Sequence, residues 1–320
     1  MFEVLDTSKK VAETSDHVHI DQQGLRRLIK GWVEQGVVVP PWNDRYHFND
    51  GSEKTVSYLL VLDSLNFCFW PSAGKKKWEI DYESGELSGY YALSASLKRA
   101  VESGIPITRA DYLAELSYDG VRTVLGGRGD LQLFHRRCEI LNELGRVLLE
   151  DYDGRACRLV EDAGGSAVNL TELLAKKLAS FRDTAVYKGQ RVFFYKRAQI
   201  VAADLHGAFE GKAWGLFGDM GRLTSFADYK VPQVLRHVGV LRYTRELAEK
   251  VDQMQLIEAG SSEEVEIRAN TIRAVQLMKE EMEKMGRDLK AYEIDWILWN
   301  MGQHPDFKVK PYHRTLTIFY

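Results

Sequence analysis

Hydrophobic residues return every three or four positions along most of this chain, which is the spacing of one face of an α-helix. The pattern is clearest in residues 130–151, where one broad apolar face predicts a helix central to the core. Residues 261–285 are also amphipathic but carry many Glu, Lys and Arg, so we expect a solvated outer face there. Further helices are predicted over residues 5–13, 21–32, 52–63, 91–102, 170–178, 196–209, 228–239 and 292–299.

A few segments suggest strands or turns instead. Residues 78–86 contain a glycine turn and predict a small hairpin, and the alternation in residues 312–320 predicts an ordered edge strand. Residues 215–221 predict a glycine-rich hairpin. No repeat, low-complexity tract or linker divides the chain, so we predict one domain over residues 1–320. The predicted fold class is mainly α with a small β-sheet.

Composition and charge narrow the class of partner. The chain has 320 residues, of which 45% are hydrophobic, which is enough for a substantial core. The formal net charge is -3 and the pI is near 6.3. A protein that holds a nucleic-acid duplex by bulk electrostatics usually needs a clearly basic face. We therefore expect a small polar substrate and no direct contact with a duplex.

Cysteine spacing and the absence of long apolar runs indicate the cellular compartment of the protein. The three cysteines are widely spaced and form no CxxC pair, so neither a disulfide framework nor a zinc site is indicated. The His17-Val18-His19 sequence lacks a third ligand at recognisable spacing, and we expect no metal and no cofactor. No stretch resembles a signal peptide or a membrane span. We expect a soluble, cytoplasmic protein whose oligomeric state the sequence does not fix.

The segment around Asp228 is the first candidate for chemistry. Asp228 precedes apolar residues at helical spacing, so we expect it to be the N-cap of a helix that stops at Gly239. A carboxylate at this position accepts backbone N–H bonds and lies at the positive end of the helix dipole, so it should stay ionised at neutral pH. Asp228 is then either an ordinary cap or a fixed anion in an active site.

Four other residues are candidates for a site, and for Lys196, Arg197 and Asp295 the placement is costly without a partner. Lys196 and Arg197 stand at the start of a predicted helix, where positive charge opposes the helix dipole unless an anion compensates. Asp295 shares a helical face with aromatic residues, and a carboxylate among aromatics is expensive to bury alone. His47 lies in a proline-stopped loop, and it is either a pocket-lining residue or a satisfied, partly buried histidine.

Four strings of residues resemble those of the queuosine salvage protein family: Phe194-Tyr-Lys-Arg-Ala-Gln-Ile200, Phe226-Ala-Asp-Tyr-Lys-Val-Pro-Gln233, Glu293-Ile-Asp-Trp-Ile-Leu-Trp299 and Pro311-Tyr-His-Arg-Thr-Leu-Thr-Ile-Phe-Tyr320. The resemblance extends from Ser15 to the last residue. It implies a queuosine 5′-phosphate N-glycosylase, also called a hydrolase, with a helical fold similar to helix-hairpin-helix DNA glycosylases. The hydrophobic-Gly-hydrophobic-Gly signature of those glycosylases is imperfect here.

The resemblance also implies roles in cleaving a ribosyl C–N bond. Asp228 is expected to stabilise the cationic sugar, to orient water as a base, or to add covalently, and these options stay open. Lys196 is expected to contact the sugar or the phosphate. Asp295 is expected to bind the guanine-like edge of the base. The ring would lie against Phe226, Trp70 or Phe67.

The two charged ends of the implied substrate need partners as well. The substrate amine, which is expected to be cationic, would pair with Asp63 or Glu293. The candidate donors for the 5′-phosphate are Lys196, Arg197, Tyr229, Lys230, Arg236 and His237. Two rival interpretations remain open: a DNA-repair type of base glycosylase with the same fold, and a non-catalytic protein that binds a nucleoside or base.

Overall fold

The computed structural model describes residues 3–83 and 85–320, and helices dominate them. The helices are α1 (Val4–Glu13), α2 (Gln22–Gln35), α3 (Glu53–Ser64), α4 (Tyr90–Glu102), α5 (Ala110–Ala114), α6 (Tyr118–Leu125), α7 (Phe134–Tyr152), α8 (Ala156–Asp162), α9 (Ala167–Lys177), α10 (Lys196–Ala208), α11 (Lys230–His237), α12 (Arg245–Asp252), α13 (Ser262–Lys284) and α14 (Ala291–Met301). Every long helix predicted from hydrophobic spacing is present.

In the part of the chain that the structure describes, the strands form three separate antiparallel pairs, whereas the sequence predicted one small sheet. Strands β2 (Glu79–Tyr82) and β3 (Gly85–Ser88) make the predicted hairpin, and β4 (Thr184–Tyr187) pairs with β5 (Gln190–Phe193). Strand β1 (Val18–Ile20) pairs with β6 (Leu241–Tyr243). This last pair ties the start of the chain to its final third.

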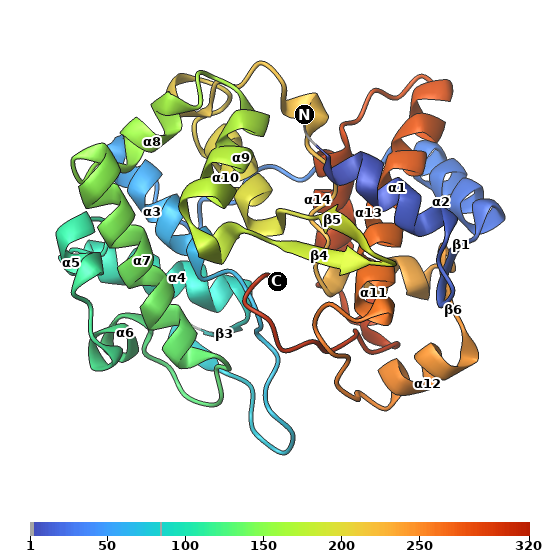
Figure 1. Cartoon of the computed structure of the whole chain (residues 1–320), viewed down its shortest axis with the longest axis horizontal. Helices are drawn as coiled ribbons and strands as arrows, with labels where there is room; N and C mark the ends of the chain where they lie inside the picture. The colour runs from blue at the N-terminus through green and yellow to red at the C-terminus, as the bar shows by residue number, and fades with distance from the viewer. Residues whose placement is uncertain (1–2, 84) are drawn as a thin grey trace.

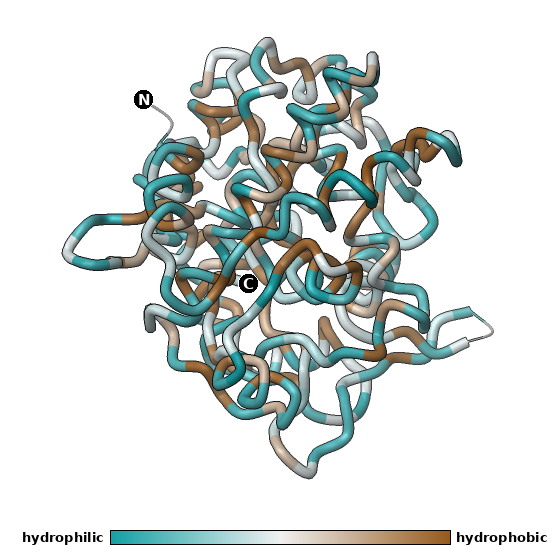
Figure 2. The backbone as a smooth tube through the Cα atoms, turned by 90° about the vertical axis from the view of Figure 1, so that its right-hand side faces the viewer, coloured by the Kyte–Doolittle hydropathy of each residue, from teal (hydrophilic) through white to brown (hydrophobic). Residues whose placement is uncertain are grey.

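Two large hydrophobic cores divide the molecule (Figure 1). One core is built from α3 to α10, which lie on the left of Figure 1, and the other from α2 and α11 to α14 on the right. The loops that protrude from the body are mainly hydrophilic (Figure 2). The C-terminal Tyr320 lies between the two halves, since its carbonyl accepts from the Cys68 N–H and its ring packs on Arg268. The halves form one compact body.

Helix α13 corrects the expectation of a solvated outer face. Its first half is buried, and Glu264, Glu266 and Arg268 are each at most 3% exposed. The polar residues stay inside because they have partners: Glu266 accepts from Tyr187 Oη and from the Val18 N–H, and Arg268 pairs with Asp183. Counting charged residues therefore predicted exposure where the structure has a buried polar network.

Two predicted β elements are absent. Residues 312–320 form no strand, and the alternation there runs opposite to hydrophobicity, because His313, Thr315 and Thr317 are buried whereas Leu316 is exposed. A single isolated bridge joins Arg314 to Leu256, so the alternation reports burial without strand pairing. Residues 215–221 do not form a hairpin of strands. Short 3₁₀ turns at Ala213–Gly215 and Met220–Arg222 take its place.

Candidate active site

A cavity of about 870 Å³ opens between the two halves. Residues 40–47 and α4 contribute to its wall from one half, and α11 and α14 from the other. Lys196, Asp228 and Asp295 all line this cavity, although they come from three different segments. The structure therefore brings together the three polar residues on which the sequence analysis placed most of the chemistry.

Asp228 is held by the first amides of α11. Its Oδ1 accepts from the N–H groups of Lys230 at 2.8 Å and Val231 at 2.9 Å, so the side chain caps the helix although the helix itself starts at Lys230. Burial raises the pKa of Asp228, and the Lys196 ammonium and the two amides oppose that shift. The cap hydrogen bonds therefore favour the ionised form, as expected, but they do not fully offset the loss of water.

Lys196 is the first residue of α10 and is 5% exposed. Its backbone N–H donates to Asp183 Oδ2 at 3.1 Å, which satisfies one of the free amides at the start of the helix. Its ammonium donates to the Asn66 carbonyl at 3.1 Å. Burial lowers the pKa of Lys196 to about 8, and the strongest opposing effect is the negative charge of Asp228. The ammonium keeps hydrogen-bonding capacity for a ligand.

Asp295 lies on α14 with one oxygen fixed. Its Oδ1 accepts from Ser225 Oγ at 2.5 Å and from the Phe226 N–H at 2.8 Å. Burial, and then the neighbouring charge of Asp228, raises the pKa of Asp295 to about 8. At neutral pH the carboxyl group therefore carries a proton. Asp228 and Asp295 thus lie in one cavity but differ in how strongly burial favours the protonated form. Such a difference allows one carboxyl group to act as an acid while the other stays an anion.

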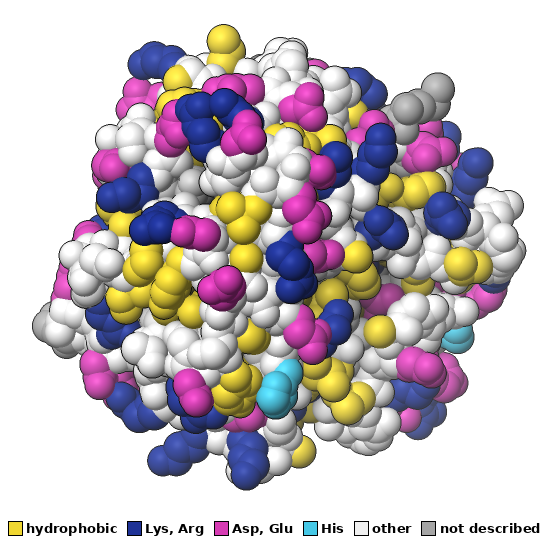
Figure 3. Space-filling model, turned by 60° about the vertical axis from the view of Figure 1, so that its left-hand side comes forward, with side chains coloured by type: hydrophobic (Ala, Val, Ile, Leu, Met, Phe, Trp, Pro, Cys, Tyr) yellow, Lys and Arg dark blue, Asp and Glu magenta, His cyan; other side chains and the backbone are white. Residues whose placement is uncertain are grey.

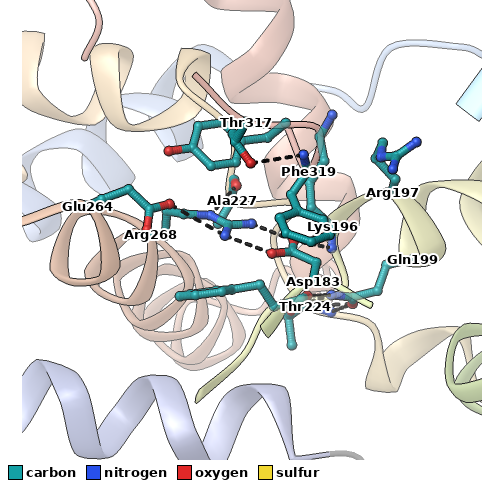
Figure 4. A network of polar contacts seen from close by, with 12 residues as sticks. Asp183, Lys196, Arg197, Gln199, Thr224, Ala227, Glu264, Arg268, Thr317 and Phe319 are labelled. Carbon is teal, nitrogen blue, oxygen red and sulfur yellow. Dashed lines mark hydrogen bonds and ion pairs between the residues drawn. The ribbon is translucent and has the colours of Figure 1, made fainter. Parts of the chain in front are cut away.

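A buried ion-pair network lies behind the cavity (Figure 4). Arg268 donates to Asp183 Oδ1 at 2.9 Å and Oδ2 at 2.6 Å, and Glu264 lies 3.6 Å away. The Arg268 Nε–H also donates to the carbonyl oxygen of Ala227 at 3.1 Å. Asp183 holds the amide of Lys196, and Ala227 precedes Asp228. The network therefore fixes the backbone beside both candidate catalytic residues.

A second polar chain lies along the cavity wall formed by residues 40–47, α4 and α10. His47 Nε2 lies 2.8 Å from Tyr90 Oη, which is 3.2 Å from Asp204 Oδ2. His47 Nδ1 contacts the carbonyl oxygen of Asn43, and burial lowers the pKa of His47 to about 4. The predicted His47 lines the cavity, whereas Tyr90 and Asp204 had not been assigned to the site. The spacing of Lys196, Ile200 and Asp204, four residues apart on one helix, was the signal available for Asp204.

Three lysines that line the cavity lie close to one another. Burial lowers the pKa of Lys230 to about 8, and the charges of Lys308 and Lys77 add to that shift. Burial and Lys308 also lower the pKa of Lys77. Among the described residues none of the three has an acidic partner within 4.0 Å. Lys77 and Lys308 had no recognisable motif around them, so the sequence analysis missed them.

Some of the other predicted site residues line the cavity and some do not. Phe67, Phe226 and Tyr229 line the cavity. Trp70 is buried but does not line it, and its ring lies under Arg314 instead. Asp63 is fully buried behind the cavity, and among the described residues neither of its carboxylate oxygens makes a hydrogen bond of normal geometry. Burial, and then Asp204, raises the pKa of Asp63 well above its usual range.

Four further candidates are engaged elsewhere and do not line the cavity. Arg197 is buried and donates to the carbonyl oxygens of Asp63, Ser64 and Ser180. Arg236 forms a two-pronged ion pair with Asp252, at 2.8 and 3.0 Å. The His237 ring packs on Phe307, and Glu293 accepts from the N–H of Lys290 at the start of α14. Their contacts are those of structural residues.

Within residues 3–83 and 85–320, His, Cys, Asp and Glu side chains form no group of three that could hold a metal ion. No helix in these two ranges is both long and apolar enough to cross a membrane.

Comparison with known proteins identifies the family. A family model described as queuosine salvage protein matches residues 46–320. A Sphaerobacter thermophilus protein named queuosine 5′-phosphate N-glycosylase/hydrolase is 46% identical over 317 residues, covering 99% of this chain and 97% of that protein. Proteins of the same name from Mus musculus and Dictyostelium discoideum are 35% and 36% identical, and each alignment covers at least 98% of both chains. The chain therefore belongs to the queuosine salvage protein family.

Proposed function

We propose that this chain hydrolyses the N-glycosidic bond of queuosine 5′-monophosphate and releases queuine for salvage. The observation that carries the proposal is the meeting of Asp228, Lys196 and Asp295 in one cavity, each with a pKa displaced by burial. Such displaced groups in a cavity are typical of catalytic sites. The names of the curated relatives supply the substrate class.

In this proposal Asp228 acts on the sugar. Loss of the base leaves positive charge on the ribose, and a fixed carboxylate beside it lowers the barrier. Its Oδ1 is tied to two amides, so Oδ2 is the oxygen available to the reacting carbon or to an attacking water. Stabilisation of the cation, activation of water and covalent addition all use this oxygen. Lys196 keeps the carboxylate ionised and donates to the ribose or to the attacking water.

Asp295 then acts on the base. Queuine is a 7-deazapurine, so position 7 is a carbon atom and cannot accept the proton that helps ordinary purines depart. A protonated Asp295 can donate to another acceptor on the base as negative charge develops there. Ser225 and Phe226 hold Oδ1 of Asp295, which also fixes the orientation of its second oxygen, Oδ2. The aromatic rings of Phe67 and Phe226 provide flat apolar surfaces for the base.

The lysines on the cavity wall are assigned to the 5′-phosphate. Lys77, Lys230 and Lys308 repel one another and lack acidic partners among the described residues, so a dianion between them would relieve the repulsion. Lys230 also lies nearest in sequence to Asp228. With this assignment the phosphate would lie beside the sugar, as a 5′-nucleotide requires.

The proposal extends to fold likeness, location and partners. The order of α10, the glycine-containing turns and α11 with Asp228 before it supports a fold similar to helix-hairpin-helix DNA glycosylases, within one domain. All three cysteines are free thiols, which fits a reducing cytoplasm. On the face in Figure 3, Lys and Arg are interspersed with Asp and Glu and form no continuous basic stripe, which favours a small-molecule substrate over a duplex.

The test compares wild-type protein with Asp228→Asn on queuosine 5′-monophosphate, queuosine and duplex DNA that carries damaged bases, with free base measured by chromatography. We expect the wild type to release queuine and the variant to lose at least about 10³-fold in kcat/KM while still binding free queuine. Release of a base from duplex DNA would favour a repair glycosylase. Binding without turnover by the wild type would favour a non-catalytic protein, and unchanged turnover in the variant would remove Asp228 from the mechanism.

A further inference from the structure

Asp204 is a buried carboxylate in the cavity that has no role in the proposed reaction. Four carboxylates line the cavity: Asp44, Asp204, Asp228 and Asp295. Asp44 is exposed to solvent, whereas Asp204 is 5% exposed. No cation lies within 4.0 Å of Asp204 in the described part of the chain, and the carboxylate accepts a hydrogen bond from Tyr90, which is neutral. A buried carboxyl group without a cationic partner is costly unless it is protonated or receives a cation.

Position in the chain and helix geometry separate the charged groups of the cavity. Lys230 follows Asp228 by two residues and lines the cavity together with Lys77 and Lys308. Asp204 lies on α10 about 12 Å along the helix axis from Lys196. Lys230 is therefore beside Asp228, whereas Asp204 is about two helical turns away from Lys196. The cavity is cationic where we place the phosphate and acidic at Asp204.

The hydrogen bonds around Asp204 hold it ready to accept a positive charge. Tyr90 Oη donates to Asp204 Oδ2 at 3.2 Å and lies 2.8 Å from His47 Nε2. The Nδ1 atom of His47 contacts the carbonyl oxygen of Asn43, so the imidazole is fixed against the loop. Tyr90 thus orients the Asp204 carboxylate, which lines the cavity without a cationic partner among the described residues.

The surroundings of Asp204 favour a cation as well. Tyr90, Tyr91 and Trp299 line the same cavity, with ring centroids 5.7 Å apart for Tyr90 and Trp299 and 5.5 Å for Tyr91 and Trp299. Aromatic faces attract ammonium groups, and more strongly where water is excluded. Trp42 packs closely against Gly207, where an added Cβ would lie 2.6 Å from the indole, so this wall is fixed to α10.

We propose that Asp204, held by Tyr90 and His47, binds the cationic side arm on the 7-deazapurine base and makes the enzyme selective for bases that carry one. The inference rests on the proposed function, since it concerns the same cavity. It replaces Asp63 and Glu293, neither of which lines the cavity, as the partner of the substrate amine. The ligand class is a 7-deazaguanine with a protonated amine on the substituent at position 7.

The test uses two nucleotides that differ in the charge of the arm: 7-aminomethyl-7-deazaguanosine 5′-monophosphate, which is cationic, and its neutral 7-cyano counterpart. We expect the wild type to prefer the cationic nucleotide in kcat/KM, and Asp204→Asn to reduce that preference by about tenfold to a hundredfold. Asp44→Asn removes the same charge from an exposed site on the cavity wall, so its preference should stay within about twofold of the wild type. Equal losses on both nucleotides in Asp204→Asn would overturn the assignment.

A binding measurement on the wild type keeps the proposal testable if Asp204→Asn does not fold. The free 7-aminomethyl base should bind at least about tenfold more tightly than the free 7-cyano base, measured by titration calorimetry. Equal affinities would overturn the cation subsite. If the wild type cleaves neither nucleotide, the proposed function fails, yet the affinities of the two bases still decide the role of Asp204.

Discussion

Two buried groups of charged residues lie next to each other in the structure. They differ in whether each charge has an oppositely charged partner. In the first, Arg268 makes two hydrogen bonds of 2.9 and 2.6 Å to Asp183 and has Glu264 at 3.6 Å. In the second, Lys196, Asp228 and Asp295 form no ion pair within 4.0 Å of one another. The first group is complete without a ligand, and the second is not.

The pKa values show the same contrast. The pKa of Arg268 is raised, because Asp183 compensates for burial. The pKa values of Lys196 and Asp295 both move to about 8, toward the neutral form of each group, because burial outweighs their partial compensation. A paired buried network stabilises and positions, whereas an unpaired one keeps its electrostatic capacity for a substrate.

The largest effect is expected when the complete network is broken. Arg268→Ala leaves Asp183 and Glu264 buried without their cation, which should lower the free energy of unfolding by roughly 3–5 kcal/mol. Urea unfolding followed by circular dichroism measures the change. The matched control is Arg273→Ala in the same helix, where a partly exposed arginine lies 3.4 Å from Glu280 and its loss should cost about 0.5 kcal/mol. Similar losses in the two variants would contradict the role assigned to the network.

Lys196 and Arg197 test the contrast with neighbouring residues. Lys196→Met keeps the stem but removes the ammonium beside Asp228, so kcat/KM should fall about 10²–10³-fold with a small change in stability. Arg197→Met leaves three buried carbonyl oxygens without their donor, so it should lose at least about 2 kcal/mol of stability. Thermal unfolding measures the stability of each variant, and enzyme assays below its melting temperature measure kcat/KM on folded protein, so the two effects are separated. If Arg197→Met loses activity without losing stability, the assignment of the two residues is reversed.

The same distinction explains which features of the fold and the site could be predicted from the sequence. Hydrophobic spacing predicted the helices, because each helix buries one face whatever surrounds it. It predicted α13 as a helix but not the burial of its first half, where the inward polar residues are satisfied by partners far away in the chain, such as Asp183. Asp228 stood out as a helix cap and Asp295 as a costly placement, but Lys77 and Lys308 join the site only through folding. Arg197 and Lys196 looked alike in sequence, and only their hydrogen bonds separate them.

Asp295 sharpens the contrast through pH. Its pKa of about 8 means that the carboxyl group is protonated below that pH and loses its proton as pH rises. Lys196, also near 8, loses its charge over the same range. Since the proposed mechanism needs both protons, kcat/KM should fall above about pH 8, with a limb that belongs to the two groups together. Asp295→Asn should lower kcat/KM by about 10–100-fold at neutral pH and leave a limb due to Lys196 alone.

The profile is measured as kcat/KM for queuosine 5′-monophosphate from neutral to alkaline pH in wild type and variant. Retention of full activity in Asp295→Asn would show that the base departs without a proton from this residue. Activity that rises through pH 8 in the wild type would contradict the protonation states assigned to both Asp295 and Lys196.

The smallest effect is expected at the lysines, which are unpaired but better hydrated. Lys308→Ala removes one of three charges assigned to the phosphate, and a single charge of this kind contributes about 1 kcal/mol, so KM for the 5′-monophosphate should rise about five- to tenfold. KM for the nucleoside queuosine should stay within about twofold, because it carries no phosphate. Lys212, which is exposed and paired with Glu210, gives the control variant Lys212→Ala, for which neither KM should change. Equal increases for nucleotide and nucleoside would mean that Lys308 shapes the cavity wall and does not hold the phosphate.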